Sequence, residues 1–153
     1  MIYLEPINQI KLFGLERFFN EFVTLLKENR LPNKILLSGQ KGLGKSTLAY
    51  HFINYALTLD EEFRYNLKEL SINPENRTFK TLNNKSNPNF YLIDLEVEKK
   101  TIDINQVREL IIKLNKSSFN LKPRFILIDN LELLNLNSVN ALLKILEEPP
   151  ENI

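Results

Sequence analysis

The segment Gly39–Ser46, with the sequence G-Q-K-G-L-G-K-S, decides how this chain folds. It fits the pattern G-x-x-x-x-G-K-[ST] of a phosphate-binding P-loop. The apolar run before it, residues 34–38, predicts a buried strand, and the residues from Lys45 to about Leu59 predict a helix. Glycines let the backbone curl so that successive N–H groups face an anion, and a helix N-terminus adds partial positive charge. This order predicts a nucleotide-binding site rather than a glycine-rich turn that matches by chance.

Within this loop, each side chain has an expected role. Lys45 is expected to reach the outer phosphates, and the Ser46 hydroxyl is expected to hold Mg²⁺. The residues expected to contact the nucleotide are Gly39, Gln40, Lys41, Gly42, Leu43, Gly44, Lys45, Ser46 and Thr47.

Composition limits the function only weakly. A length of 153 residues suits one domain or a piece of one, and a net charge of +1 argues neither for nor against nucleic acid. The chain has no cysteine, which excludes disulfides and a cysteine-type zinc site. No apolar run is long enough to span a bilayer, and residues 1–6 lack the features of a signal peptide. We therefore expect a cytoplasmic protein without a membrane partner.

Hydrophobic spacing predicts alternating helices and strands. The predicted helices are at about 15–29 and 45–59, after Asp103, and at about 137–148, and the predicted strands are at about 34–38, 90–95 and 124–129. Asp103 is a candidate N-cap, with Gln106 placed as in a capping box. The polar segment 71–89 predicts an irregular connection, and His51 lies off the apolar stripe of its helix, which predicts an exposed histidine. The alternation predicts an α/β fold, a parallel sheet flanked by helices.

Asp129 is the second candidate for the site. It ends a continuous apolar run that is typical of a strand covered on both faces, and such strand ends bind ligands in α/β sheets. We expect its carboxylate to share Mg²⁺ with Ser46. Many ATP-hydrolysing P-loop proteins place a glutamate next as general base, but this chain has Asn130, whose amide cannot take a proton. Glu132 would replace that base only if the backbone curled back, so the residues support binding more than hydrolysis and assign no catalytic residue.

Two other classes of P-loop protein fit less well. The sequence N-K-S-N at 84–87 nearly matches the guanine motif N-K-x-D, but Asn87 replaces the required aspartate, which argues against a GTPase. A small-molecule kinase would need an arginine-rich lid. The arginines Arg64, Arg77 and Arg108 are scattered and predict none.

The segments D-N-L-E-L-L-N at 129–135 and N-A-L-L-K-I-L-E-E-P-P at 140–150 resemble those of bacterial clamp-loader AAA+ subunits. The resemblance covers nearly the whole chain, with 71–89 the loosest part. It implies an AAA+ P-loop NTPase domain over residues 1–153 that binds ATP and Mg²⁺. It also implies a subunit of DNA polymerase III that acts with other clamp-loader subunits in a hetero-oligomeric ring, which loads the sliding clamp onto primed DNA.

Within that group the chain is most similar to delta-prime subunits. The motor subunits, gamma and tau, usually carry Asp-Glu at the Mg²⁺ strand and a cysteine zinc cluster, whereas this chain has Asp129-Asn130 and no cysteine. The resemblance thus implies a mainly structural subunit whose own ATPase activity is weak or absent. An active motor ATPase of the gamma/tau type is the alternative, and a P-loop kinase a more distant one.

The resemblance also predicts that the sequence is the N-terminal part of a longer protein. In the family, the residues after the position of Ile153 form a strand between the P-loop strand and the Mg²⁺ strand. A trans-acting arginine, a lid and an oligomerisation collar follow. We therefore expect a sheet that is incomplete at its C-terminal side.

Overall fold

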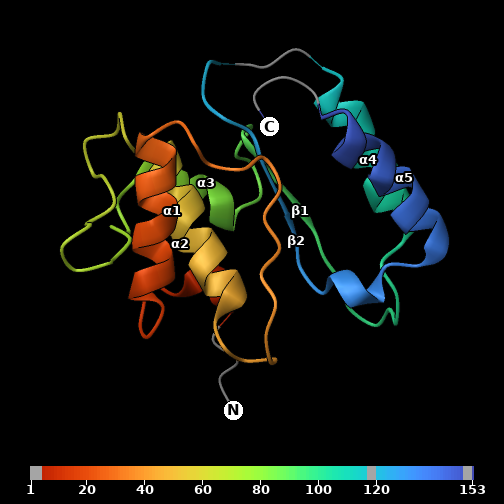
Figure 1. Ribbon diagram of the computed structural model, residues 1–153, viewed down its shortest axis with the longest axis horizontal. Coiled ribbons are helices and arrows are strands. Elements are labelled where there is room, and N and C mark those ends of the chain that lie inside the picture. Colours follow the sequence, from red (N-terminus) through yellow and green to blue (C-terminus); the bar gives the residue numbers. More distant parts are fainter. Residues whose placement is uncertain (1–4, 117–119, 150–152) are drawn as a thin grey trace. The chain divides into compact units, whose positions relative to one another are not determined.

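The computed structural model describes residues 5–116, 120–149 and 153, and Pro150 of the family signature lies outside them. The chain divides into two compact units, Met1–Asn87 and Pro88–Ile153, each of which is considered by itself. The first contains the 3-10 helix η1 (Pro6–Asn8) and the helices α1 (Glu16–Lys27), α2 (Lys45–Leu57) and α3 (Arg77–Asn83). The second contains β1 (Phe90–Ile93), α4 (Ile104–Leu114), β2 (Phe125–Ile128), the 3-10 helix η2 (Leu131–Leu133) and α5 (Leu136–Glu147) (Figure 1). No helix among the described residues is long and apolar enough to cross a membrane.

The first unit is built around α2, which packs against α1, α3 and η1. From α1, Phe19 and Val23 are buried, and the Phe19 ring stacks on Tyr65 with centroids 5.1 Å apart. This face of α1 is the one that the hydrophobic spacing predicts, because residues four apart lie above one another on a helix. The predicted helices at 15–29 and 45–59 are both confirmed, each shorter by one or two residues at an end.

Helix α2 is buried on nearly all sides, and the prediction of an exposed His51 is wrong. The buried residues of α2 are Leu48, Tyr50, His51, Phe52, Ile53, Asn54, Tyr55, Ala56 and Leu57. A helix enclosed by neighbours has no solvent face to which an off-stripe residue would turn. His51 is 0% exposed.

The polar partners of His51 fix the tautomer of its neutral ring. Its Nε2 lies 3.0 Å from the backbone oxygen of Gln9, and its Nδ1 lies 2.8 Å from the Tyr65 hydroxyl. A carbonyl oxygen only accepts, so Nε2 carries the proton and Nδ1 accepts from the Tyr65 O–H. Burial lowers the pKa of His51 to about 4, partly opposed by the hydrogen bond to Gln9.

Acidification should therefore destabilise the first unit through His51. The unfolded histidine takes up a proton near pH 6.5, whereas the folded one does so only near pH 4. The contribution of neutral His51 to the free energy of unfolding is fully present above pH 6.5. It is lost as the pH drops toward 4, and the total loss is roughly 3 kcal/mol. Denaturant unfolding of the full-length protein at pH 7 and pH 5 measures this slope. His51→Gln should flatten it, and an equal slope in the variant would contradict the assignment.

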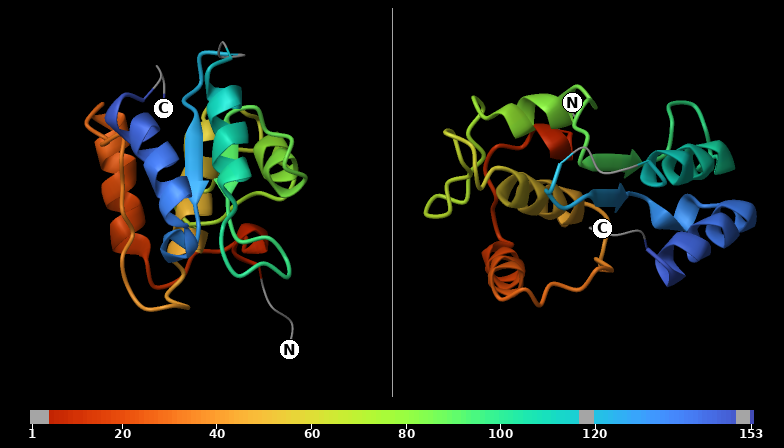
Figure 2. Two further views of the ribbon diagram at one scale, coloured as in Figure 1. Left: turned by 90° about the vertical axis from the view of Figure 1, so that its right-hand side faces the viewer. Right: turned by 90° about the horizontal axis from the view of Figure 1, so that it is seen from above.

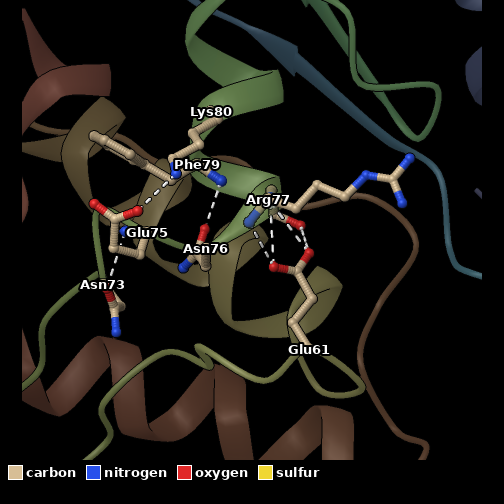
Figure 3. Close-up of polar contacts among 8 residues, drawn as sticks. Glu61, Asn73, Glu75, Asn76, Arg77, Phe79 and Lys80 are labelled. Atoms are coloured by element: carbon tan, nitrogen blue, oxygen red, sulfur yellow. Dashed lines mark hydrogen bonds and ion pairs between the residues drawn. The ribbon is translucent and has the colours of Figure 1, made fainter.

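The predicted irregular connection at 71–89 is wrong in its centre, where α3 forms (Figure 3). Asn76 caps this helix, accepting at 2.6 Å from the Phe79 N–H. The Glu61 carboxylate lies at the helix start and accepts from the N–H groups of Arg77 (2.8 Å) and Thr78 (3.2 Å). Asn76 also exchanges amide hydrogen bonds of 3.2 and 3.3 Å with Asn54 of α2. A helix forms here although the polar composition predicts a loop, because the capping side chains satisfy N–H groups that a short helix leaves unpaired.

In the second unit, β1 and β2 pair in parallel, with Phe90 beside Phe125 and Ile93 beside Ile128. The crossover between them runs through α4 and can be followed in Figure 2. Helices α4 and α5 pack together. The core residues are Ile93, Ile102, Val107, Leu110, Leu114 and Leu142. The predicted strands at 90–95 and 124–129, the final helix and the parallel pairing are confirmed. The residues of β2 are half-buried rather than covered on both faces, because the described sheet has two strands and both are edges.

Two local predictions fare differently at the start of α4. Asp103 is the N-cap, accepting at 2.9 Å from the Asn105 N–H, as predicted. The capping box is wrong, because the Gln106 amide donates at 3.0 Å to the backbone oxygen of Asp94 instead. Gln106 therefore ties α4 to the end of β1.

The predicted strand at 34–38 is also wrong. These residues have no regular structure, and Ile35 and Leu36 are 42% and 77% exposed. A strand needs a neighbour to satisfy its backbone groups, and the sheet in the described residues consists of β1 and β2 alone. The fold is thus mixed α/β with a small parallel sheet.

Candidate nucleotide-binding site

The loop before α2 has the backbone geometry that its glycines allow. Gly42 and Gly44 have φ of 87° and 78°, a region that side-chain-bearing residues rarely adopt. A Cβ added at Gly44 would lie 3.3 Å from Cδ1 of Leu15, closer than is comfortable. The loop conformation therefore depends on glycine at these positions.

The same loop presents unpaired donors. The backbone N–H groups of residues 40–45 find no acceptor within the described part of the chain. Gly44 is the N-cap of α2, so the N–H group of Lys45, the first residue of that helix, belongs to the same cradle. Unpaired N–H groups at a helix N-terminus, where the helix dipole adds positive charge, fit the oxygens of a phosphate group.

Lys45 lies over this loop. Its Nζ donates to the backbone oxygens of Gly39 at 2.9 Å and Gln40 at 2.8 Å. The ammonium therefore sits within the loop itself, where it is available to an anion bound by the N–H groups. Its neighbours Ser46 and Thr47 on the first turn of α2 are half-buried.

A cavity of about 300 Å³ adjoins the loop in the first unit. It is lined by Gln9, Lys11, Leu12, Phe13, Leu15, Gly42, Leu43, Gly44 and Thr47. The Phe13 side chain is 74% exposed, and the Lys11 ammonium lies 6.0 Å from the centre of its ring. The backbone of this segment is anchored by hydrogen bonds from Leu12 N–H to Leu70 O and from Ile72 N–H to Ile10 O. The sequence did not indicate residues 9–15 as part of the site, because the exposure of the Phe13 side chain is visible only in the structure.

A separate group of candidate residues lies in the second unit, at the carboxyl ends of β1 and β2. Asp94 follows β1 and Asp129 follows β2, on adjacent strands. The Asn130 side chain donates from Nδ2 to Oδ1 of Asp94 at 2.7 Å, and its backbone N–H donates to Oδ1 of Asp129 at 2.9 Å. Glu132 lies on η2 and is exposed. Asp94 and Gln106 at this edge were not expected from the sequence.

The predicted residues fall into two groups. Gly39 to Thr47 lie together in the first unit, and Asp129 lies in the second. The hydroxyl of Ser46 and the carboxylate of Asp129 are oxygen donors of the kind that Mg²⁺ prefers. Shared binding of Mg²⁺ by the two remains a prediction. The described residues contain no group of three or more His, Cys, Asp or Glu side chains that would hold a metal ion alone.

Comparison with curated proteins finds clamp-loader subunits of two kinds. DNA polymerase III subunit gamma/tau of Mycoplasma genitalium is 28% identical over 145 residues, which cover 95% of this chain and 23% of the relative. DNA polymerase III subunit delta' of Buchnera aphidicola (subsp. Schizaphis graminum) is 26% identical over 133 residues, which cover 87% of this chain and 38% of the relative. DNA polymerase III subunit tau/gamma of Haemophilus influenzae is 29% identical over 143 residues, which cover 92% of this chain and 19% of the relative. The chain thus spans well under half the length of these relatives.

A family model described as DNA polymerase III, delta subunit, matches residues 14–153. The match begins just before α1 and includes the loop at 39–46, both strands and α5. The chain therefore belongs to this DNA polymerase III subunit family.

Proposed function

We propose that this chain is the ATP-binding N-terminal part of a clamp-loader subunit of the delta-prime type. The observation that carries the nucleotide assignment is the glycine-rich loop before α2, where the backbone N–H groups of residues 40–45 find no acceptor within the described part of the chain. Lys45 and the loop amides would hold the phosphates, and Ser46 and Asp129 would hold Mg²⁺, which supplies charge neutralisation at the phosphates. The cavity beside Phe13 would receive the nucleoside.

The residues at the end of β2 favour delta-prime over a motor subunit. Asn130 stands where a general base would be expected, and its amide is engaged by Asp94. The absence of cysteine points the same way. Relatives of both kinds match at 28% and 26% identity, a difference too small to separate them. A gamma/tau-type motor is therefore the second candidate, supported by the intact P-loop.

The proposed partners follow from the names of the relatives and from the family. The subunit would work with other clamp-loader subunits in a hetero-oligomeric ring in the cytoplasm, and it would reach the sliding clamp and primed DNA through that complex. In this role the chain would bind ATP and contact the neighbouring subunits, but would hydrolyse little or no ATP itself.

Calorimetric titration of the full-length protein with ATP and Mg²⁺ tests this proposal. We expect saturable binding at one site per chain, with phosphate release far slower than that of a motor ATPase. A protein that binds no ATP would contradict the nucleotide assignment. Brisk hydrolysis by the protein alone would instead favour the gamma/tau alternative.

A further inference from the structure

Four residues form one hydrogen-bonded path at the carboxyl ends of β1 and β2, through both side-chain and backbone groups. Gln106 of α4 holds the backbone of Asp94, donating to its oxygen at 3.0 Å and accepting from its N–H at 3.4 Å. Oδ1 of Asp94 accepts from the Leu95 N–H at 2.7 Å and from Nδ2 of Asn130 at 2.7 Å. The Asn130 N–H then reaches Oδ1 of Asp129 at 2.9 Å. Asp94 thus links two backbone segments to the carboxylate of Asp129.

The middle of this path is a residue in an unusual conformation. Asn130 has φ of 52° and ψ of 47°, the left-handed region, which asparagine adopts more readily than most residues but still at a cost that surrounding contacts must offset. The side-chain bond to Asp94 supplies that restraint, because asparagine is short enough to reach a fixed acceptor on the neighbouring strand end. The same turn points the Asn130 N–H at the Asp129 carboxylate. Breaking the side-chain bond to Asp94 would therefore also weaken the hydrogen bond from this N–H to Asp129.

We propose that Asp94 is a positioning residue for the Asp129 carboxylate, and that it acts through Asn130. Asp94 holds Asn130 in the left-handed turn, and the Asn130 N–H then fixes the orientation in which Asp129 presents its carboxylate to Mg²⁺. This inference rests on the proposed function, since it takes Asp129 as a metal ligand. It adds a role for Asn130, which is to hold the Asp129 carboxylate in its orientation.

The experiment measures how ATP affinity of the full-length protein depends on Mg²⁺. In Asp94→Ala, the Mg²⁺ concentration that gives half of the metal-dependent gain in affinity should rise about tenfold, as expected when a group behind a metal ligand is removed. Asp94→Asn keeps an acceptor oxygen for Asn130 and should stay close to wild type. ATP affinity measured with EDTA should be the same in all three proteins, because the path does not include the phosphate loop.

A second readout does not depend on ligand. In the free protein, hydrogen exchange of the Asn130 amide should be at least about tenfold faster in Asp94→Ala than in wild type, since the restraint on the turn is lost. Glu96→Ala is the matched control: it removes a carboxylate that contacts Gln106 at 3.3 Å but is not bonded to Asn130. It should leave both the Mg²⁺ dependence and the exchange of Asn130 unchanged.

A glycine variant keeps the test decisive if Asp94→Ala folds poorly. Asn130→Gly adopts the left-handed turn without help, so adding Asp94→Ala to it should change the Mg²⁺ dependence no further. If the double variant depended on Mg²⁺ differently from Asn130→Gly, or if Asp94→Ala behaved like the wild type, the role of Asp94 would be wrong. Either result would leave the metal site itself in place. Wild-type protein whose ATP affinity ignores Mg²⁺ would overturn the metal site itself, and with it this role.

Discussion

Lys45→Ala should lower the affinity of the full-length protein for Mg²⁺-ATP by about 10- to 100-fold. The Lys45 ammonium donates to Gly39 O and Gln40 O and so lies beside the N–H groups of residues 40–45, for which the described residues offer no acceptor. A hydrogen bond to a charged group contributes about 1.5–3 kcal/mol, which corresponds to this range of affinity. Titration calorimetry with the wild type and the variant measures the loss.

The fold should survive this substitution. The hydrogen bonds of the Lys45 ammonium lie at the surface, and the buried residues of α2 begin at Leu48. Lys45 is also the first residue of α2, where a positive charge opposes the helix dipole and alanine is the better helix former. We therefore expect a thermal unfolding midpoint equal to or slightly above that of the wild type.

Lys34→Ala is the matched control, because it removes the same charge from an exposed position five residues before the motif. It should bind ATP like the wild type. Equal losses in the two variants would show that net charge, rather than the position of Lys45, governs binding. Unchanged affinity in Lys45→Ala would refute the phosphate-binding assignment of the loop.

The second unit was predictable from the sequence because its apolar runs, helical spacing and cap residue each depend on nearby residues and all indicate the same elements. The runs that became β1 and β2 are short and apolar, and the helical pattern between them leaves a parallel pair as the simple arrangement. Asp103 was recognisable as a cap because aspartate at a helix start has one common role. The positions of Lys45 and Ser46 on the first turn of α2 followed from the motif itself.

The wrong predictions all depend on distant partners. His51 is buried because Gln9 and Tyr65, far from it in sequence, satisfy both ring nitrogens. Helix α3 forms because Glu61 and Asn54 lie against its start. The strand expected at 34–38 fails for the converse reason, since an apolar run becomes a strand only beside another strand. Periodicity within one segment carries no information about any of these contacts.

Exchanging the acid and the amide at positions 94 and 130 should have the second large effect. Asn130→Glu alone would introduce a carboxylate at the position where a general base is expected in ATP-hydrolysing P-loop proteins. Its carboxylate would meet Oδ1 of Asp94, which now accepts from Asn130 at 2.7 Å. Two carboxylates at that distance repel, and one of them holds a proton at neutral pH, so the new glutamate would be a poor general base.

Stability measures this repulsion directly. Asn130→Glu should be less stable than Asn130→Gln, which shares the cost of a longer side chain in the left-handed turn but adds no charge. Adding Asp94→Asn to Asn130→Glu should recover the difference, with a coupling free energy of roughly 1–3 kcal/mol in a double-mutant cycle at pH 7. The coupling should shrink as the pH falls toward 4, because the carboxyl groups of the unfolded chain then take up protons as well and the cost of holding one in the folded protein disappears.

Hydrolysis separates the variants further. Asn130→Glu with Asp94→Asn pairs a carboxylate at 130 with an amide at 94, so the glutamate stays ionised beside the Asp129 carboxylate. A positioned general base contributes about 10²- to 10⁴-fold, and phosphate release by the full-length double variant should exceed that of the wild type by about 10²-fold. Asn130→Glu alone should show little gain. If the single variant hydrolysed ATP as fast as the double one, Asp94 would not contact residue 130 in the nucleotide-bound protein, and the pairing seen at the ends of β1 and β2 would have no bearing on catalysis.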